Sequence, residues 1–326
     1  MSATEHNQYG PAALPALQGA TLGALLDAGT RLLEAAGVAF GHGTSNARDE
    51  AAWLILWRLG LPLDTPITGD GAEDEPENGM ANRPITPAEL AQVATLFDER
   101  IRTRKPAAYL THEAWLMGVP FYVDERAIVP RSFIAELLVD GSLDVFLSAD
   151  TRQVLDLCTG NGSLAVLAAL VWPDVAVTAA DISPEALEVA RINVAKHGLQ
   201  ERIRLQRSDG LAELPGPWDL ILCNPPYVNA ASMAQLPPEY RAEPALALAG
   251  GADGMDFIRR LLADAPAHLS PHGVLVLEIG NERAHFEAAF PRLQPIWLDT
   301  SAGADQVLLL PREALCAPDA FVQSIA

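Results

Sequence analysis

The sequence predicts an α/β protein with a mainly parallel sheet, preceded by a small helical domain. Two observations support this prediction. Between residues 127 and 312, short runs of aliphatic and β-branched residues alternate with amphipathic stretches, as in a parallel sheet covered by helices on both faces. Between residues 1 and 106, the apolar residues recur instead at helical spacing. At 326 residues, the chain is long enough for both domains.

Three helices are expected in the N-terminal domain. The third has the clearest start, because Thr86 suits the N-cap, Pro87 suits the first helical position and Glu89 completes a capping box. The second helix covers residues 46–59. Between these two helices, the acidic stretch 69–79 cannot build a core, and a mobile loop is predicted there. The first helix is indicated by an apolar stripe of Leu22, Leu25, Leu26, Leu32 and Leu33.

A linker and a tail flank the α/β domain. Residues 107–126 combine aromatic and β-branched residues around a turn, which predicts a hairpin between the two domains, and residues 313–326 are expected to form a C-terminal tail. Strands are expected at residues 154–156, 175–180, 203–206, 219–223, 274–278 and 306–310. Helices are expected at residues 133–147, 163–171, 184–197 and 255–269. Ligands of such sheets bind at the carboxyl ends of the strands.

Composition narrows the possible function classes. The chain has 42 acidic residues against 22 Lys and Arg, for a net charge of -20, which repels nucleic-acid phosphates and favours a basic protein partner. Its three cysteines are far apart and its histidines are scattered, so neither a disulfide framework nor a metal site is predicted. No apolar run is long enough to cross a bilayer, and the N-terminus does not resemble a secretory signal. A cytoplasmic protein without a membrane partner is expected.

A nucleoside-containing cofactor is indicated by VLDLCTGNGSLAV, which has the order strand, glycine turn, helix. Gly160 and Gly162 allow the backbone to approach a ligand closely. The next strand ends in Asp181, whose carboxylate can accept hydrogen bonds from ribose hydroxyls. Cys158 is predicted to be a small buried side chain in the turn and not a nucleophile. Because GNGSLA also matches the dinucleotide pattern, a nicotinamide cofactor is the rival interpretation.

The sequence ILCNPPYV favours group transfer to a planar NH2 group over hydride transfer. The side-chain oxygen of Asn224 and the carbonyl of Pro225 can accept the two hydrogens of such a group, while Tyr227 packs against its plane. Two acceptors increase the electron density on nitrogen and direct its lone pair, so positioning provides much of the rate. Both a side-chain amide and an exocyclic adenine amine fit this arrangement.

These motifs resemble those of a known family. DLCTGNG at 156–162, Asp181, SDG at 208–210 and NPPYV at 224–228 look like the class I methyltransferases that modify glutamine amides, the HemK/PrmC and PrmB group. The resemblance covers nearly the whole chain and includes the helical N-terminal domain. It implies a Rossmann-like class I fold with a seven-stranded sheet, S-adenosylmethionine as cofactor and protein glutamine methylation as activity.

Two further stretches favour one branch of this group. Residues 109–138 lack the PRPDTE-like sequence that is usual in release-factor enzymes, and they resemble the branch that acts on large-subunit ribosomal protein three. Residues 236–262 also resemble that branch. The resemblance therefore implies that this basic ribosomal protein is the substrate, and that the helical domain recognises it.

The resemblance also implies roles for individual residues. The cofactor is expected to contact Cys158, Thr159, Gly160, Asn161, Gly162, Asp181, Asp209 and Asn224, with Pro130 and Arg131 at the wall of its pocket. The substrate glutamine is expected to contact Asn224, Pro225, Pro226 and Tyr227, with Glu243 helping to cover it. Asn224, Pro225 and Tyr227 form the expected catalytic set. Gly210 stands where some release-factor enzymes carry an aromatic residue, so the sequence does not identify a side chain that stacks on adenine.

Three alternatives to this function stay open at the level of sequence. The chain could be a release-factor glutamine methyltransferase of the sister branch. It could methylate the N6 amine of adenine in DNA, although the acidic charge counts against this. It could also be a ribosome-assembly factor that no longer catalyses, although the intact NPPY sequence counts against that.

Overall fold

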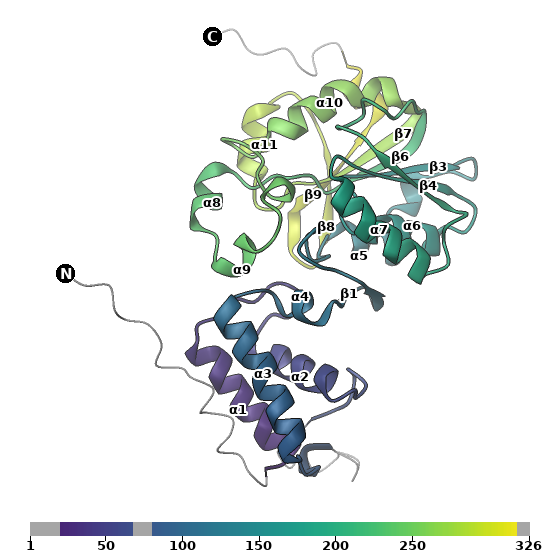
Figure 1. The fold of residues 1–326 in the computed structure, drawn as a ribbon. Coiled ribbons are helices and arrows are strands. Elements are labelled where there is room, and N and C mark those ends of the chain that lie inside the picture. The colour runs from purple at the N-terminus through teal and green to yellow at the C-terminus, as the bar shows by residue number, and fades with distance from the viewer. Residues whose placement is uncertain (1–19, 68–79, 318–326) are drawn as a thin grey trace, which may run out of the picture. The chain divides into compact units, whose positions relative to one another are not determined.

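The computed structural model describes residues 20–67 and 80–317, which form two compact units (Figure 1). One unit comprises the chain up to His112 together with Pro237–Ala242, and the other comprises Glu113–Leu236 and the chain from Glu243 onward. The acidic stretch 69–79, with its predicted loop, lies outside the described residues. None of the helices in the described ranges is both long and apolar enough to cross a bilayer.

The first unit is helical, and its expected helices are confirmed. The predicted capping box is present, because the Thr86 hydroxyl accepts a hydrogen bond from the Glu89 backbone N–H at 3.2 Å and the Glu89 carboxylate accepts one from the Thr86 N–H at 2.9 Å. Leu25, Leu54 and Phe97 are fully buried in the core. The helices are α1 (Leu22–Ala35), α2 (Ala47–Arg58), α3 (Pro87–Thr103), α4 (Ala107–Thr111) and α9 (Pro238–Arg241), with a 3-10 turn, η2 (Met80–Asn82).

The first part of the segment 107–126, where the sequence predicts a hairpin, is helical in the structure. Ala107–Thr111 form helix α4, which begins after Pro106 and ends at His112, where φ is +54°. The hairpin itself follows, with β1 (Ala114–Leu116) antiparallel to β2 (Val119–Phe121). Proline is well tolerated at the start of a helix, and this local preference outweighs the strand propensity of the residues that follow it.

The second unit contains a seven-stranded sheet with the order β5-β4-β3-β6-β7-β9-β8. Neighbouring strands from β5 to β7 are parallel, while β9 is antiparallel to both β7 and β8, so the expected mainly parallel, Rossmann-like fold is confirmed. The strands are β3 (Gln153–Leu157), β4 (Ala176–Asp181), β5 (Ile203–Arg207), β6 (Trp218–Cys223), β7 (Leu269–Glu278), β8 (Ile296–Thr300) and β9 (Gly303–Pro311).

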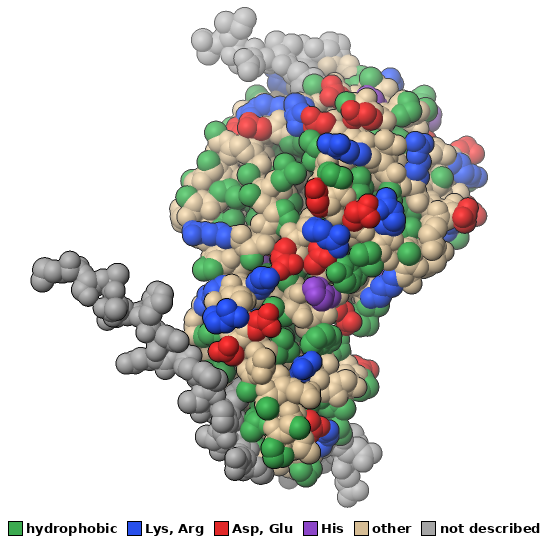
Figure 2. All heavy atoms as spheres, in the orientation of Figure 1, with side chains coloured by type: hydrophobic (Ala, Val, Ile, Leu, Met, Phe, Trp, Pro, Cys, Tyr) green, Lys and Arg blue, Asp and Glu red, His purple; other side chains and the backbone are tan. Residues whose placement is uncertain are grey.

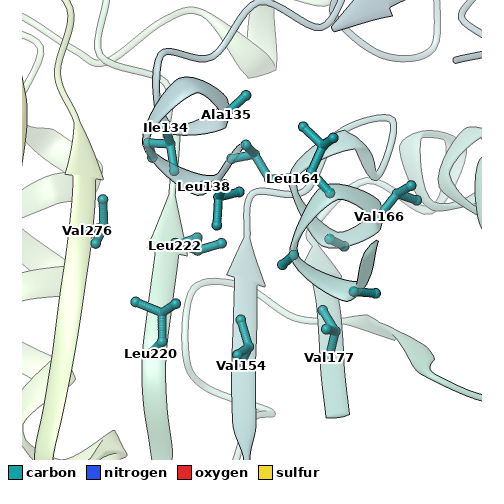
Figure 3. Close-up of a cluster of buried hydrophobic side chains, with 14 of the residues drawn as sticks. Ile134, Ala135, Leu138, Val154, Leu164, Val166, Val177, Leu220, Leu222 and Val276 are labelled. Carbon is teal, nitrogen blue, oxygen red and sulfur yellow. The ribbon is translucent and has the colours of Figure 1, made fainter. Parts of the chain in front are cut away.

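Helices cover both faces of this sheet (Figure 1). Leu138 and Leu164 belong to the same buried cluster as Val154 and Leu222 (Figure 3). Leu155 belongs to the cluster of the opposite face. Consecutive strand residues point to opposite faces, which explains the continuous apolar runs of these strands. The helices are α5 (Ile134–Val139), α6 (Ser163–Val171), α7 (Pro184–Lys196), α8 (Ala230–Gln235), α10 (Asp256–His268), α11 (Arg283–Ala289) and α12 (Arg312–Leu315), with 3-10 turns η3 (Asp144–Phe146) and η4 (Ala245–Ala247).

Two further features of the second unit differ from what the sequence predicts. The helix expected at 133–147 is interrupted, because α5 ends at Val139 and is followed by a turn in which Gly141 has a φ of +78°. Strand β8 is absent from the strands located by sequence. It lies at the edge of the sheet and is only partly buried, so it lacks the apolar run of the central strands.

Candidate functional site

A cavity of about 590 Å³ lies in the second unit, at the carboxyl ends of β3, β4 and β6. Residues that are far apart in the sequence meet there because these parallel strands end at the same edge of the sheet. Among the residues that line the cavity are Cys158, Gly160, Asp181, Asp209, Asn224 and Pro226. The structure therefore brings the glycine turn, the acid at the end of β4 and the start of the NPPY sequence together.

The turn after β3 has an unusual backbone that explains its glycines. Cys158, Gly160 and Gly162 all have positive φ values, of 60°, 54° and 83°. A β-carbon on Gly162 would lie 3.1 Å from the β-carbon of Ala190 in α7, so the turn packs closely against that helix. A β-carbon on Gly160 would meet no protein atom within 4 Å. Since Gly160 also lines the cavity, a larger side chain there would take up space open to a ligand.

Asp181 connects the end of β4 to this turn. Its Oδ2 accepts a hydrogen bond from the Gly160 N–H at 2.9 Å, and its Oδ1 accepts one from the Ser183 N–H at 2.9 Å. Burial raises the pKa of Asp181, although these backbone hydrogen bonds act in the opposite direction. The Ile182 N–H also contributes a hydrogen bond. Three such bonds do not use all the lone pairs of a carboxylate, so Asp181 can still accept a hydrogen bond from a ligand in the cavity.

Two buried polar atoms beside the turn have no hydrogen-bond partner within the described part of the chain. One is Oδ1 of Asp156, whose Oδ2 accepts hydrogen bonds from the Thr159 hydroxyl and the Ala165 N–H. The other is Nδ2 of Asn161. Burial raises the pKa of Asp156 to about 7. Buried polar atoms are normally paired. Neither of these two residues belongs to the cavity lining, so the two atoms lie beneath the turn and do not themselves mark a ligand contact.

Cys158 and Cys223 lie next to each other at the ends of β3 and β6. A hydrogen bond with the Cys223 thiol, together with burial, raises the pKa of Cys158 well above its ordinary value. A thiol that stays protonated is a poor nucleophile. This environment agrees with the prediction that Cys158 is not a nucleophile, but the residue is half-buried and lines the cavity, and is not the buried side chain that the sequence predicts.

The NPPY sequence begins directly after β6. Asn224 lines the cavity, and its side chain has no hydrogen-bond partner among the described residues. Pro226 also lines the cavity, whereas Pro225 is buried beside it. Tyr227 is half-buried and is not part of the lining; its hydroxyl donates a hydrogen bond to Oε1 of Glu278 at 3.3 Å. The free amide of Asn224 is therefore available to a bound group.

Glu278 predicts a pH dependence of stability. Burial raises its pKa from the ordinary 4.5 to about 7, so between these pH values the folded protein holds a proton that the unfolded chain releases. This contribution to stability is present below pH 4.5 and is lost as the pH rises through 7. When the pH is raised from 5 to 8, the unfolding free energy of wild type, measured with urea, should fall by roughly 2–3 kcal/mol more than that of Glu278→Gln. An equal change in the unfolding free energy of the two proteins would contradict the raised pKa of Glu278.

Comparison with known proteins identifies the family. The Methyltransferase small domain family matches residues 136–236. The ribosomal protein uL3 glutamine methyltransferase of Bordetella pertussis is 55% identical over 285 residues, which cover 87% of this chain and 92% of that protein. The protein of the same name from Bradyrhizobium diazoefficiens is 48% identical over 278 residues, or 83% of this chain and 84% of its own length.

The chain belongs to the ribosomal protein uL3 glutamine methyltransferase family. It is thus a methyltransferase, and its methyl donor is S-adenosylmethionine. Among solved structures, a methyltransferase from Pyrococcus furiosus aligns with a TM-score of 0.43 at 22% identity, over 60% of this chain and 90% of that one.

Some residues expected at the site of this methyltransferase do not line the cavity. Glu243 is buried and accepts hydrogen bonds from both Nη atoms of Arg131, each at 2.6 Å, and from the Val129 N–H at 2.9 Å. Pro130 is also buried outside the lining, which includes residues 126–128 instead. The substrate role of Glu243 and the cofactor roles of Pro130 and Arg131 stay predictions. In this structure, the ion pair connects the segment before α5 to the segment that follows α9.

The methyltransferase cavity also has lining residues that the sequence does not reveal. Phe257 and Arg260 belong to α10, where an amphipathic pattern indicates ordinary core packing. The Arg260 guanidinium lies 5.6 Å from the centre of the Phe257 ring and 3.2 Å from Oδ1 of Asp209. Phe257 thus provides an aromatic side chain at the cavity, although the loop at Gly210 provides none. Only the tertiary fold brings it there, because α10 lies far along the chain from the glycine turn.

Proposed function

We propose that this enzyme transfers a methyl group from S-adenosylmethionine to the side-chain amide nitrogen of a glutamine in large-subunit ribosomal protein three, uL3. The observation that carries the proposal is the position of Asn224, whose unpaired side-chain amide lies at a cavity suited to the methyl donor. The named relatives support the choice of substrate, because their similarity to this chain extends over almost their whole length. A cytoplasmic location accords with a substrate that is a ribosomal protein.

Two parts of the cavity lining suit the donor. The glycine turn allows the backbone at Cys158 and Gly160 to approach the donor closely. Asp181 is placed to accept hydrogen bonds from ribose hydroxyls, and Asp209 and Phe257 form another part of the lining. When bound, the donor supplies an electrophilic methyl group on a sulfonium.

The remaining chemistry belongs to residues of the NPPY sequence. The Asn224 oxygen and the Pro225 carbonyl accept the two hydrogens of the glutamine amide, and Tyr227 supports the plane of that amide. These acceptors counteract the delocalisation of the nitrogen lone pair and orient it for attack. A strong base is unnecessary before attack, because the amide nitrogen becomes acidic only as it gains the methyl group and then releases its proton.

The cofactor assignment predicts a selective loss of affinity. Replacing Asp181 with alanine should raise the dissociation constant for S-adenosylmethionine about 10- to 100-fold, since hydrogen bonds to a charged group are lost. Calorimetric titration measures this directly. Asp27→Ala serves as the control, because its carboxylate is half-exposed, paired with Arg48 and not part of the cavity lining, and a change of less than fivefold is expected. Equal effects of the two variants would argue against a special role for Asp181.

The substrate is tested by offering labelled S-adenosylmethionine and three candidates side by side: purified uL3, a class I release factor and duplex DNA. Label on uL3 alone supports the proposal. Label on the release factor moves the enzyme to the sister branch, and label on DNA overturns the protein substrate. Basic and acidic side chains are interspersed on the face drawn in Figure 2, and the net charge of -20 opposes DNA binding. If S-adenosylmethionine binds and no candidate is labelled, a non-catalytic binding role becomes the leading interpretation.

A further inference from the structure

Three contacts hold Tyr227 in place. Its hydroxyl donates a hydrogen bond to Oε1 of Glu278 at 3.3 Å. Its ring lies against Gly280, where a β-carbon would come within 2.5 Å of the ring carbon Cε2. Its carbonyl oxygen lies against Gly254, where a β-carbon would come within 2.2 Å. Both glycines have positive φ values, so the chain approaches Tyr227 where other residues would be strained or would clash.

Glu278 is the buried end of one of these contacts. It is the last residue of β7 and is only 2% exposed. Its Oε2 accepts hydrogen bonds from the Ser132 hydroxyl at 2.6 Å and from the Phe133 N–H at 2.9 Å, at the start of α5. Its Oε1 is left facing the Tyr227 hydroxyl. Burying a carboxylate costs free energy, and none of the steps proposed for methyl transfer uses Glu278.

We infer that Glu278 is a positioning residue for methyl transfer, which fixes the Tyr227 ring against the plane of the substrate amide. The inference rests on the proposed function and adds a residue to its site. Ser132 and Phe133 hold one oxygen of the carboxyl group. Above pH 7, where the group is ionised, the other oxygen presents a fixed acceptor to Tyr227. Gly280 limits how far the ring can turn, and the hydrogen bond selects one orientation within that limit.

A double-mutant cycle tests this link. Glu278→Ala and Tyr227→Phe should each lower kcat about tenfold with little change in the KM for uL3. The double variant should also have a kcat only about tenfold below that of wild type. Glu278→Gln, which keeps the shape and one acceptor, should recover part of the lost kcat and guards against misfolding of the alanine variant. A double variant slowed about 100-fold would show independent effects and overturn the inference.

The matched control removes the tyrosine hydroxyl from another tyrosine–carboxylate pair of this unit. The Tyr122 hydroxyl donates to Oδ2 of Asp124 at 2.8 Å. The effects of Tyr122→Phe and Glu278→Ala on kcat should multiply, because Glu278 is not the partner of Tyr122. The loss of kcat in the double variant Tyr122→Phe/Glu278→Ala could instead fall short of the product of the two single losses by as large a factor as in the Tyr227→Phe/Glu278→Ala pair. That result would mean that Glu278→Ala perturbs the unit generally, and would also overturn the inference.

A second readout does not depend on turnover. Hydrogen exchange of residues 224–228, followed by mass spectrometry, should become faster to a similar extent in Glu278→Ala and in Tyr227→Phe, and no faster in the double variant. If wild type methylates none of the offered substrates, the proposed function fails while this exchange experiment still decides whether Glu278 holds Tyr227. Unchanged exchange in Glu278→Ala would contradict the link.

Discussion

Replacing Asn224 with alanine should lower the rate of methyl transfer by about 10² to 10³, the usual loss when one preorganised polar group is removed from a reacting centre. The side chain stands at the cavity with no partner inside the described protein, so its removal exposes no buried group that would destabilise the fold. The loss should therefore appear in kcat, while the unfolding free energy changes by less than about 1 kcal/mol.

Single-turnover transfer from labelled S-adenosylmethionine to uL3 measures this effect. Asn224→Asp is the matched variant, because it keeps the shape and one acceptor oxygen while a second, ionisable oxygen replaces the NH2 group. It should retain more activity than Asn224→Ala if the oxygen accepts a hydrogen of the substrate amide. An alanine variant within fivefold of wild type would remove Asn224 from the catalytic set.

Replacing Arg100 with methionine should destabilise the helical unit by about 3–5 kcal/mol. The guanidinium is completely buried and lies between two buried carboxylates: Nε donates to Oε1 of Glu50 at 2.8 Å, and Nη1 donates to Oε1 of Glu239 at 3.2 Å. Its Nη2 also donates to the Ala39 carbonyl at 2.9 Å. Without the arginine, both carboxylates lose a partner that offsets their desolvation.

The charges of Arg100 and Glu50 predict how the loss of stability in Arg100→Met varies with pH. Burial raises the pKa of Glu50, while Arg100 acts to lower it, so removing Arg100 should raise that pKa further. The destabilisation should consequently be smaller at pH 5, where protonation relieves the unpaired charge, than at pH 8. Urea unfolding at the two pH values measures the difference.

A surface ion pair of the same unit provides the control. Arg48 pairs with Asp27 at 3.0 Å, and both side chains are about half exposed. Arg48→Met should change the unfolding free energy by less than about 1 kcal/mol, because water screens such pairs. An equally small effect of Arg100→Met would contradict the importance assigned to the buried cluster.

Short-range features of this protein were determined by sequence alone. The capping box at Thr86, the glycine turn after β3 and the position of Asn224 after β6 all follow from the preferences of neighbouring residues. The order of parallel strands then brings Asp181 and Asn224 to the same edge of the sheet, which the general rule for such folds anticipates.

The tertiary structure alone decided which distant side chains meet. Glu239 follows the NPPY sequence in the chain, yet it is buried with Arg100, 139 residues away, in the helical unit. Glu243 pairs with Arg131 outside the cavity lining, and Glu278 meets Tyr227. Local propensities act over a few residues, whereas these pairs depend on which elements pack together and on the need of each buried charge for a partner.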